Sequence, residues 1–130
     1  MYWIEWNVLF MKKDKFLILN LTKDFIADVD KYLVNFPNKE MELKREIKEN
    51  GYKMLLEIYE ANCTTDLSKR KNIQESIIAK IGYLDFLINL CYDKQLINGK
   101  KYLKFGESLN YILKYVNGWL NQTKTQGMVV

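Results

Sequence analysis

Histidine is absent from the 130 residues of this chain, and proline occurs only once, at Pro37. Without histidine, the sequence has no Ser–His or Cys–His nucleophile pair and no histidine-liganded zinc site. It also lacks a glycine-rich phosphate loop, a paired-glycine dinucleotide turn and an acidic calcium loop. We therefore expect a protein that is not an enzyme, with no cofactor, no metal and no small-molecule substrate.

Cysteine and long apolar runs are also scarce. Cys63 and Cys91 have no cysteine partner at a metal-like spacing. We interpret both as core residues on helix faces, and the alternatives are a disulfide or a reactive thiol. No apolar run approaches the roughly 18 residues that cross a bilayer. Because the first residues do not resemble a signal peptide, we expect a cytoplasmic protein with no membrane partner.

The few helix breakers divide the chain into four segments. Pro37 has no amide proton and disfavours helix at the preceding residue, so we predict one helix from about residue 21 to 35 and another from about 39 to 61. The stretches 62–70 and 96–102 are the next predicted joints. In each segment, apolar residues recur at spacings of three or four, as on one face of an α-helix. Examples are Phe25, Val29 and Leu33; Ile47, Met54 and Ile58; Ile73, Ile77, Ile81, Leu84, Ile88 and Cys91; and Phe105, Leu109, Ile112, Val116 and Trp119.

Four amphipathic helices with short connections bury their apolar stripes most simply in an antiparallel, up-down-up-down four-helix bundle. The predicted fold class is therefore all-α. We divide the chain into an N-terminal extension of uncertain structure (1–20), the bundle (21–122) and a flexible C-terminal tail (123–130).

The third predicted helix has a second apolar face, roughly opposite its core stripe. A bundle helix that is apolar on both sides is usually covered on both sides. The cover is either another subunit or the N-terminal segment with Trp3, Ile4, Trp6, Val8, Leu9 and Phe10, and we favour self-association. We expect Asp85, on the edge of the core stripe, to pair with a lysine of a neighbouring helix. The candidate interface residues are Tyr83, Phe86, Leu87 and Leu90.

Basic residues are concentrated in the second half of the chain. Residues 1–66 contain ten Lys/Arg and twelve Asp/Glu, a net charge of −2, whereas residues 67–130 contain ten against four, a net charge of +6. Lysines mixed with tyrosines can neutralise phosphates and stack on unpaired bases. The alternative is an ordinary solvated lysine surface. The candidate nucleic-acid-binding residues are Lys69, Arg70 and Lys71 at the start of the third helix, and Lys100, Lys104, Tyr111, Lys114 and Tyr115 on the fourth.

Three stretches of the chain resemble a known family. They are KDFIADVDKYLVNFPNKEMELKREIKENGYKMLLEIYEAN, AKIGYLDFLINLCYDKQLINGKKY and YVNGWLNQTK. Together they are similar to the four-helix-bundle Avd proteins, the accessory variability determinants of diversity-generating retroelements, which are related to the intervening-sequence proteins of bacterial 23S rRNA genes. The resemblance covers about residues 23–124. Its family-motif residues are Phe36 and Pro37 at the first joint and Gly118 and Trp119 near the end of the fourth helix.

The resemblance implies a small basic protein that forms a homopentameric barrel. It also implies a non-catalytic accessory role, in which the oligomer binds reverse transcriptase and template RNA, or an RNA/DNA hybrid, and supports mutagenic reverse transcription. The alternative is a protein-binding or structural bundle, like the intervening-sequence proteins, with no nucleic-acid role.

Overall fold

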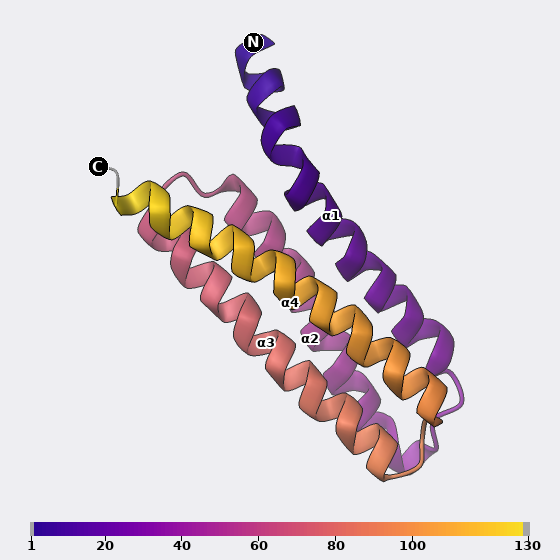
Figure 1. Ribbon diagram of the computed structural model, residues 1–130. Coiled ribbons are helices and arrows are strands. Elements are labelled where there is room, and N and C mark those ends of the chain that lie inside the picture. Colours follow the sequence, from indigo (N-terminus) through magenta and orange to yellow (C-terminus); the bar gives the residue numbers. More distant parts are fainter. Residues whose placement is uncertain (1, 129–130) are drawn as a thin grey trace.

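Each of the three predicted joints separates two long helices (Figure 1). The computed structural model describes the backbone of residues 2–128 and the side chains of residues 16–128. It contains α1 (Tyr2–Tyr32), a short 3-10 helix η1 (Asn38–Glu40), α2 (Met41–Cys63), α3 (Leu67–Asp93) and α4 (Gly99–Met128). Over residues 2–128 there is no β-strand, so the prediction of an all-helical chain with four main helices is confirmed. In that same range, no helix is long and apolar enough to span a membrane.

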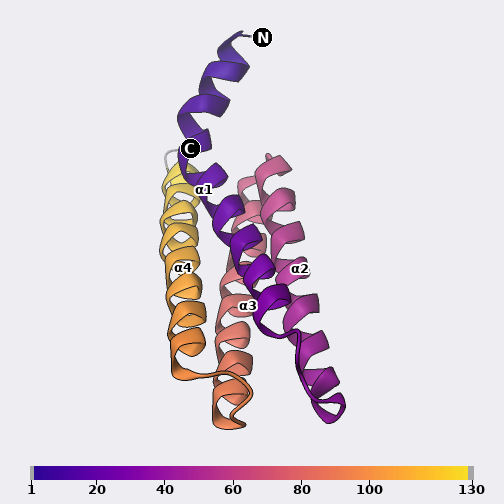
Figure 2. The ribbon, with the colours of Figure 1, turned by 90° about the vertical axis from the view of Figure 1, so that its right-hand side faces the viewer.

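The helices pack as a closed ring of four neighbours. α1 contacts α2, α2 contacts α3, α3 contacts α4, and α4 returns to contact α1. Figure 1 shows the α1–α2 and α3–α4 connections at one end of the bundle and the α2–α3 connection at the opposite end. In Figure 2, α1 lies between α4 and α2, in agreement with these contacts. Each helix therefore buries one face against two neighbours.

The predicted apolar stripes form the core. Phe25 and Val29 of α1 and Leu33 just beyond its end are buried, as are the stripe residues Phe105, Leu109, Ile112, Val116 and Trp119 of α4. Phe25 and Phe105 meet edge to face, with ring centroids 5.8 Å apart. Ile47, Met54 and Ile58 of α2 are buried, whereas Leu43 and Leu55, which share the predicted stripe, are half-buried. The stripe residues of α3 are also buried, except that Ile73 is half-buried. Because no single helix of this kind is stable alone, this shared core stabilises the fold.

Side-chain and backbone hydrogen bonds define the joints. Asp66, within the predicted joint 62–70, accepts hydrogen bonds from the amides of Ser68 (2.9 Å) and Lys69 (3.2 Å), and is the N-cap of α3. At the start of α4, Asn98 Oδ1 accepts a hydrogen bond from the amide of Lys101 at 2.9 Å. Among the residues that the structure describes, Gln95 is in the left-handed region, with φ of 61°, one position before the predicted joint 96–102. The joint therefore begins earlier than predicted.

Helix bounds differ from the prediction at both ends of the chain. The backbone is helical from Tyr2, so residues 2–20 continue α1 without a break, and α1 ends at Tyr32. At the other end, α4 extends through residues 123–128, which were predicted to be a flexible tail. The physical reason there is packing: Thr123 is buried and donates a hydrogen bond from its hydroxyl to the carbonyl oxygen of Trp119. The alternative cover of α3, by Trp3 and its neighbours, falls on side chains outside the described residues.

Candidate nucleic-acid interface

A cluster of lysines surrounds Tyr32 where α1 ends and α4 begins. The amino groups of Lys31, Lys101 and Lys104 lie 5.4, 5.4 and 5.0 Å from the centre of the Tyr32 ring. The ring packs edge to face on the buried ring of Phe105, with centroids 5.9 Å apart. We call these four residues, Lys31, Tyr32, Lys101 and Lys104, the Tyr32 cluster. Contact of a cation with an aromatic ring is favourable, so the core holds the charges in a defined arrangement.

Hydrogen bonding couples Tyr32 to Lys104. The ammonium group of Lys104 donates a hydrogen bond to the Tyr32 hydroxyl at 2.8 Å. This hydrogen bond lowers the pKa of Tyr32, and the positive charges of Lys104 and Lys31 act in the same direction. The same hydrogen bond raises the pKa of Lys104. The positive charge on Lys104 is therefore maintained at neutral pH.

Carboxylates lie next to this basic cluster in the groove between α1 and α4. The Oδ1 atom of Asp28 lies 3.9 Å from the Lys104 ammonium nitrogen. Asp24, Asp28 and Glu107 line a hollow of about 450 Å³ together with Lys104 and Tyr111. The potential along this groove therefore changes sign, from positive at the Tyr32 cluster to negative one or two turns further along.

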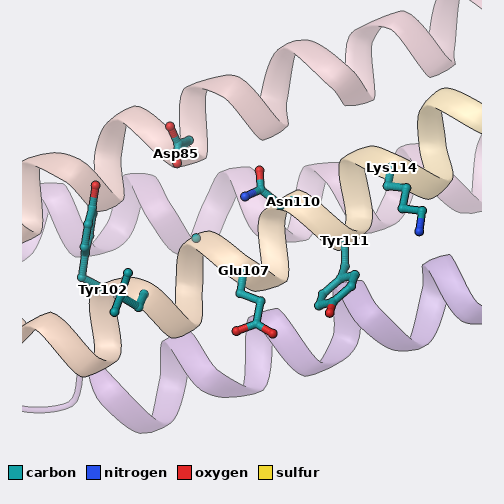
Figure 3. Close-up of a pocket in the computed structure, with 8 residues that line it drawn as sticks. Asp85, Tyr102, Glu107, Asn110, Tyr111 and Lys114 are labelled. Atoms are coloured by element: carbon teal, nitrogen blue, oxygen red, sulfur yellow. The ribbon is translucent and has the colours of Figure 1, made fainter.

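A second groove lies between α3 and α4, on the other side of the α4 ridge (Figure 3). It has a volume of about 640 Å³ and is lined by Asp85, Tyr102, Leu103, Gly106, Glu107, Asn110, Tyr111 and Lys114. Its wall is fixed by the stacked rings of Tyr92 and Tyr102, 4.3 Å apart, and by a hydrogen bond from the Tyr102 hydroxyl to Asn89 Oδ1. Aromatic rings, an amide and charged groups of both signs therefore line one open groove.

Asp85 does not pair with a lysine, contrary to the prediction. Its carboxylate accepts a 3.3 Å hydrogen bond from Asn89, and no ion pair joins it to a lysine among residues 16–128. Lys114, which lines the same groove, instead lies with its ammonium nitrogen 5.6 Å from the centre of the Tyr115 ring. The physical reason is that Asp85 and Asn89 are one helical turn apart on α3, so the local hydrogen bond forms without ordering a long side chain.

Predicted nucleic-acid-binding residues of α4 occupy two levels of the helix. Lys100 is exposed and directly precedes Lys101 of the Tyr32 cluster in the sequence. Lys104 belongs to that cluster. Tyr111 and Lys114 lie along the groove of Figure 3. The Tyr111 side chain is 47% exposed. Tyr115 is less exposed, because it is half-buried against the bundle. Of the two tyrosines, Tyr111 is the one whose ring is more accessible to a base.

The basic start of α3 lies at the opposite end of the bundle. α4 has 30 residues, and at 1.5 Å per residue it spans about 45 Å. Arg70 is committed to the fold, because its Nε and Nη2 atoms donate hydrogen bonds of 3.0 and 2.7 Å to the carbonyl oxygen of Thr64 at the end of α2. Lys69 is exposed, and Lys71 lies 3.8 Å from Glu75 and lines a hollow with Lys124. The eight candidate residues therefore do not form one surface.

The candidate oligomer interface on α3 is smaller than predicted. Tyr83 and Phe86 stack with centroids 6.4 Å apart, and the Phe86 side chain is 54% exposed. The Tyr83 hydroxyl donates a hydrogen bond to Glu46 of α2 at 2.9 Å. The prediction of Leu87 as an interface residue is wrong. Leu87 is 4% exposed, because it faces the bundle core beside Leu84 and Ile88. Leu90 is half-buried and packs against the core.

Of the four family-motif residues, two are buried and two are exposed. Phe36 is buried at the first joint and Trp119 in the core, whereas Pro37 and Gly118 are exposed. The two cysteines differ: Cys91 is buried as predicted, but Cys63 is exposed at the end of α2, where the helix leaves the core.

Sequence reasoning missed Tyr32, Lys31 and Lys101. The Lys-Tyr pair at 31–32 and the Lys-Lys-Tyr run at 100–102 are the available signals, but only the contact of α1 with α4 brings them together. Within the side chains of residues 16–128, no group of three His, Cys, Asp or Glu residues is arranged to hold a metal ion. Comparisons with protein-family models, curated proteins and solved structures found no match.

Proposed function

We propose that the chain is a non-catalytic accessory protein of a diversity-generating retroelement. In this role an antiparallel, up-down-up-down bundle assembles into an oligomer, a homopentamer by analogy with the Avd proteins, in the cytoplasm. The oligomer is a basic platform that binds reverse transcriptase and template RNA and so supports mutagenic reverse transcription. The family resemblance of residues 23–124 supplies the biological role.

One observation carries the nucleic-acid part of this proposal: lysines and accessible tyrosines follow α4 from the Tyr32 cluster to Lys114. Lysines at such a surface release counterions from phosphates, and exposed rings stack on bases without regard to sequence. Five chains with a formal charge of +4 each carry +20, a field that attracts RNA. Tyr111, exposed between two grooves, supports stacking in particular.

Salt dependence of RNA binding tests the proposal. We expect fluorescence anisotropy to show single-stranded RNA binding that weakens as salt increases. Replacing Lys100, Lys104 and Lys114 by Gln should reduce the slope of log K against log salt by about 0.7 for each lost phosphate contact. A matched control replaces Lys39, Lys44 and Lys53 by Gln, with the same loss of charge. Equal slopes in the wild type and the α4 triple variant would reject this surface.

A protein-binding bundle without a nucleic-acid role is the second candidate. It is favoured by the carboxylates of Asp24, Asp28 and Glu107, which line the α1–α4 groove and repel phosphates. This candidate predicts that the purified protein does not bind RNA at any salt concentration down to about 50 mM, while it still binds a protein partner. The same anisotropy measurement therefore separates the two functions.

A further inference from the structure

We propose that the Tyr32 cluster is a binding site for one phosphate group of a single-stranded polynucleotide. The amino groups of Lys31, Lys101 and Lys104 and the hydroxyl of Tyr32 supply the hydrogen-bond donors. The inference rests on the proposed function for its polynucleotide, but the site itself follows from the arrangement of these four side chains.

The cluster has more positive charge than its surroundings neutralise. Asp28 is the one carboxylate that approaches it, at 3.9 Å from Lys104, and neither Lys31 nor Lys101 forms an ion pair with any residue from 16 to 128. Three ammonium groups around one ring repel each other, and Lys101 lies in the first turn of α4, where the helix dipole disfavours a cation. A bound anion would neutralise this excess, and the N-terminus of α4 also favours an anion.

One donor, the Tyr32 hydroxyl, is held in place before a ligand binds. Tyr32 packs on Phe105, which is 1% exposed, and Phe105 packs on Phe25 in the centre of the bundle. The Tyr32 hydroxyl accepts its hydrogen bond from Lys104, so its own proton remains available to a second acceptor. The lowered pKa of Tyr32 makes this phenol a stronger donor than an ordinary tyrosine. Little ordering of the Tyr32 side chain is then needed on binding.

A phosphate fits this site better than a nucleobase does. The amino groups of three lysines lie within 5.4 Å of the Tyr32 ring centre, so a base that stacked on this ring would displace favourable cation contacts. Tyr111 has no such lysine contact among residues 16–128, and its ring is free to stack. The two tyrosines are therefore assigned different parts of the same ligand, the phosphate to Tyr32 and the base to Tyr111.

Inorganic phosphate, titrated at constant ionic strength and followed by NMR, tests the site alone. In the wild type we expect saturable shifts confined to residues 31–32 and 100–104. The variant Lys31→Gln/Lys101→Gln should lose them. The charge-matched control Lys44→Gln/Lys53→Gln, on α2, should keep them. Tyr32→Phe, which retains the ring, should weaken phosphate binding about 3- to 10-fold, as expected for one lost hydrogen bond of about 1 kcal/mol. Shifts spread over all lysines, or retained in Lys31→Gln/Lys101→Gln, would overturn the site.

Single-stranded RNA oligomers then test the ligand, measured by anisotropy over a range of salt. Removing Lys31 and Lys101 should lower the salt slope by about 0.7, the value for one lost phosphate contact, with no change in the α2 control. Oligomers with a 5′-phosphate or a 5′-hydroxyl distinguish the source: equal affinity identifies an internal phosphodiester, and tighter binding of the phosphorylated oligomer identifies a terminal phosphate. An unchanged slope would overturn this site while leaving the proposed function. Localised phosphate shifts without RNA binding would instead uphold a phosphate site, but would overturn its polynucleotide ligand together with the nucleic-acid part of the proposed function.

Discussion

The two cysteines of this chain have the same chemistry but different surroundings. Cys63 is exposed at the end of α2, whereas Cys91 is buried in α3. Burial raises the pKa of the Cys91 thiol to about 12, and the negative charge of Glu40 acts in the same direction. Since the thiolate is the reactive form, the two thiols should differ strongly in reactivity.

We expect a thiol reagent at pH 8 to modify Cys63 in the native protein and Cys91 only after unfolding. Equal labelling of both native thiols would contradict the assignment.

The free energy of unfolding should also depend on pH. Below pH 9 both states keep the Cys91 proton. Between pH 9 and 12 the unfolded state loses it and the native state retains it, so the free energy of unfolding falls by about 1.4 kcal/mol per pH unit. Urea titrations at pH 8 and 10 measure this fall, and Cys91→Ala should lack it.

Single residues were predictable where their role depends on a repeating pattern. The buried residues Phe25, Ile81 and Trp119 follow from spacings of three and four, which report one helix face. Tyr32 and Arg70 could not be assigned in this way. The role of Tyr32 depends on lysines about 70 positions away in the sequence, and Arg70 binds a carbonyl oxygen across a turn. Such contacts exist only after the helices pack.

At the scale of helices and joints, the α3–α4 connection contains a strained residue. Gln95 has a φ of 61°, which costs a non-glycine residue about 1–2 kcal/mol. The conformation is kept because the Gln95 amide donates to Tyr92 O at 2.9 Å and the Leu96 amide to Cys91 O at 2.8 Å. These two bonds close the end of α3, as in a Schellman motif.

Replacing Gln95 with glycine should therefore stabilise the protein by about 1 kcal/mol, because glycine adopts this conformation without a steric cost. Chemical denaturation measures the change. Gln122→Gly, at an exposed position within α4, is the control and should destabilise the protein by about 1 kcal/mol. If both substitutions lower the free energy of unfolding to the same extent, the result would contradict the left-handed conformation of Gln95.

Joints were easier to predict than helix ends. Pro37, the capping residues of 62–70 and the segment that contains Asn98 all carry local signals, and each lies at or next to a connection. The extent of α1 and α4 was not predictable. Residues 2–20 show no clear period, and residues 123–128 contain two Thr and a Gly, which are weaker helix formers. Burial of Thr123 against the bundle overrides that weak preference.

At the scale of the whole molecule, the stacked pair of Tyr83 and Phe86 is the remaining candidate for contact between subunits. The pair is exposed on α3, on the side that faces α2, where a hydrogen bond to Glu46 fixes Tyr83. Leu90 adds a half-buried apolar surface on the same face of the helix. Assembly into an oligomer is part of the proposed function.

We expect light scattering of the purified protein to give a mass well above the 15.6 kDa of one chain. Phe86→Lys should reduce the mass to that of a monomer, because a charge in an apolar interface must be desolvated without a partner. Its circular dichroism should remain that of the wild type. Val34→Lys, a charge at an equally exposed apolar position away from α3, should leave the assembly intact. A wild-type monomer at tens of micromolar would contradict assembly through this face.

The four-membered ring of helix contacts has a consequence for chain connectivity. α1 touches α4 as well as α2, and the start of α1 and the end of α4 lie towards the same end of the bundle (Figure 1). A flexible peptide that joined the last turn of α4 to α1, with new termini opened at Gln95, would therefore preserve every pair of neighbouring helices. A circular permutant of this kind should recover the same core from a different order of synthesis.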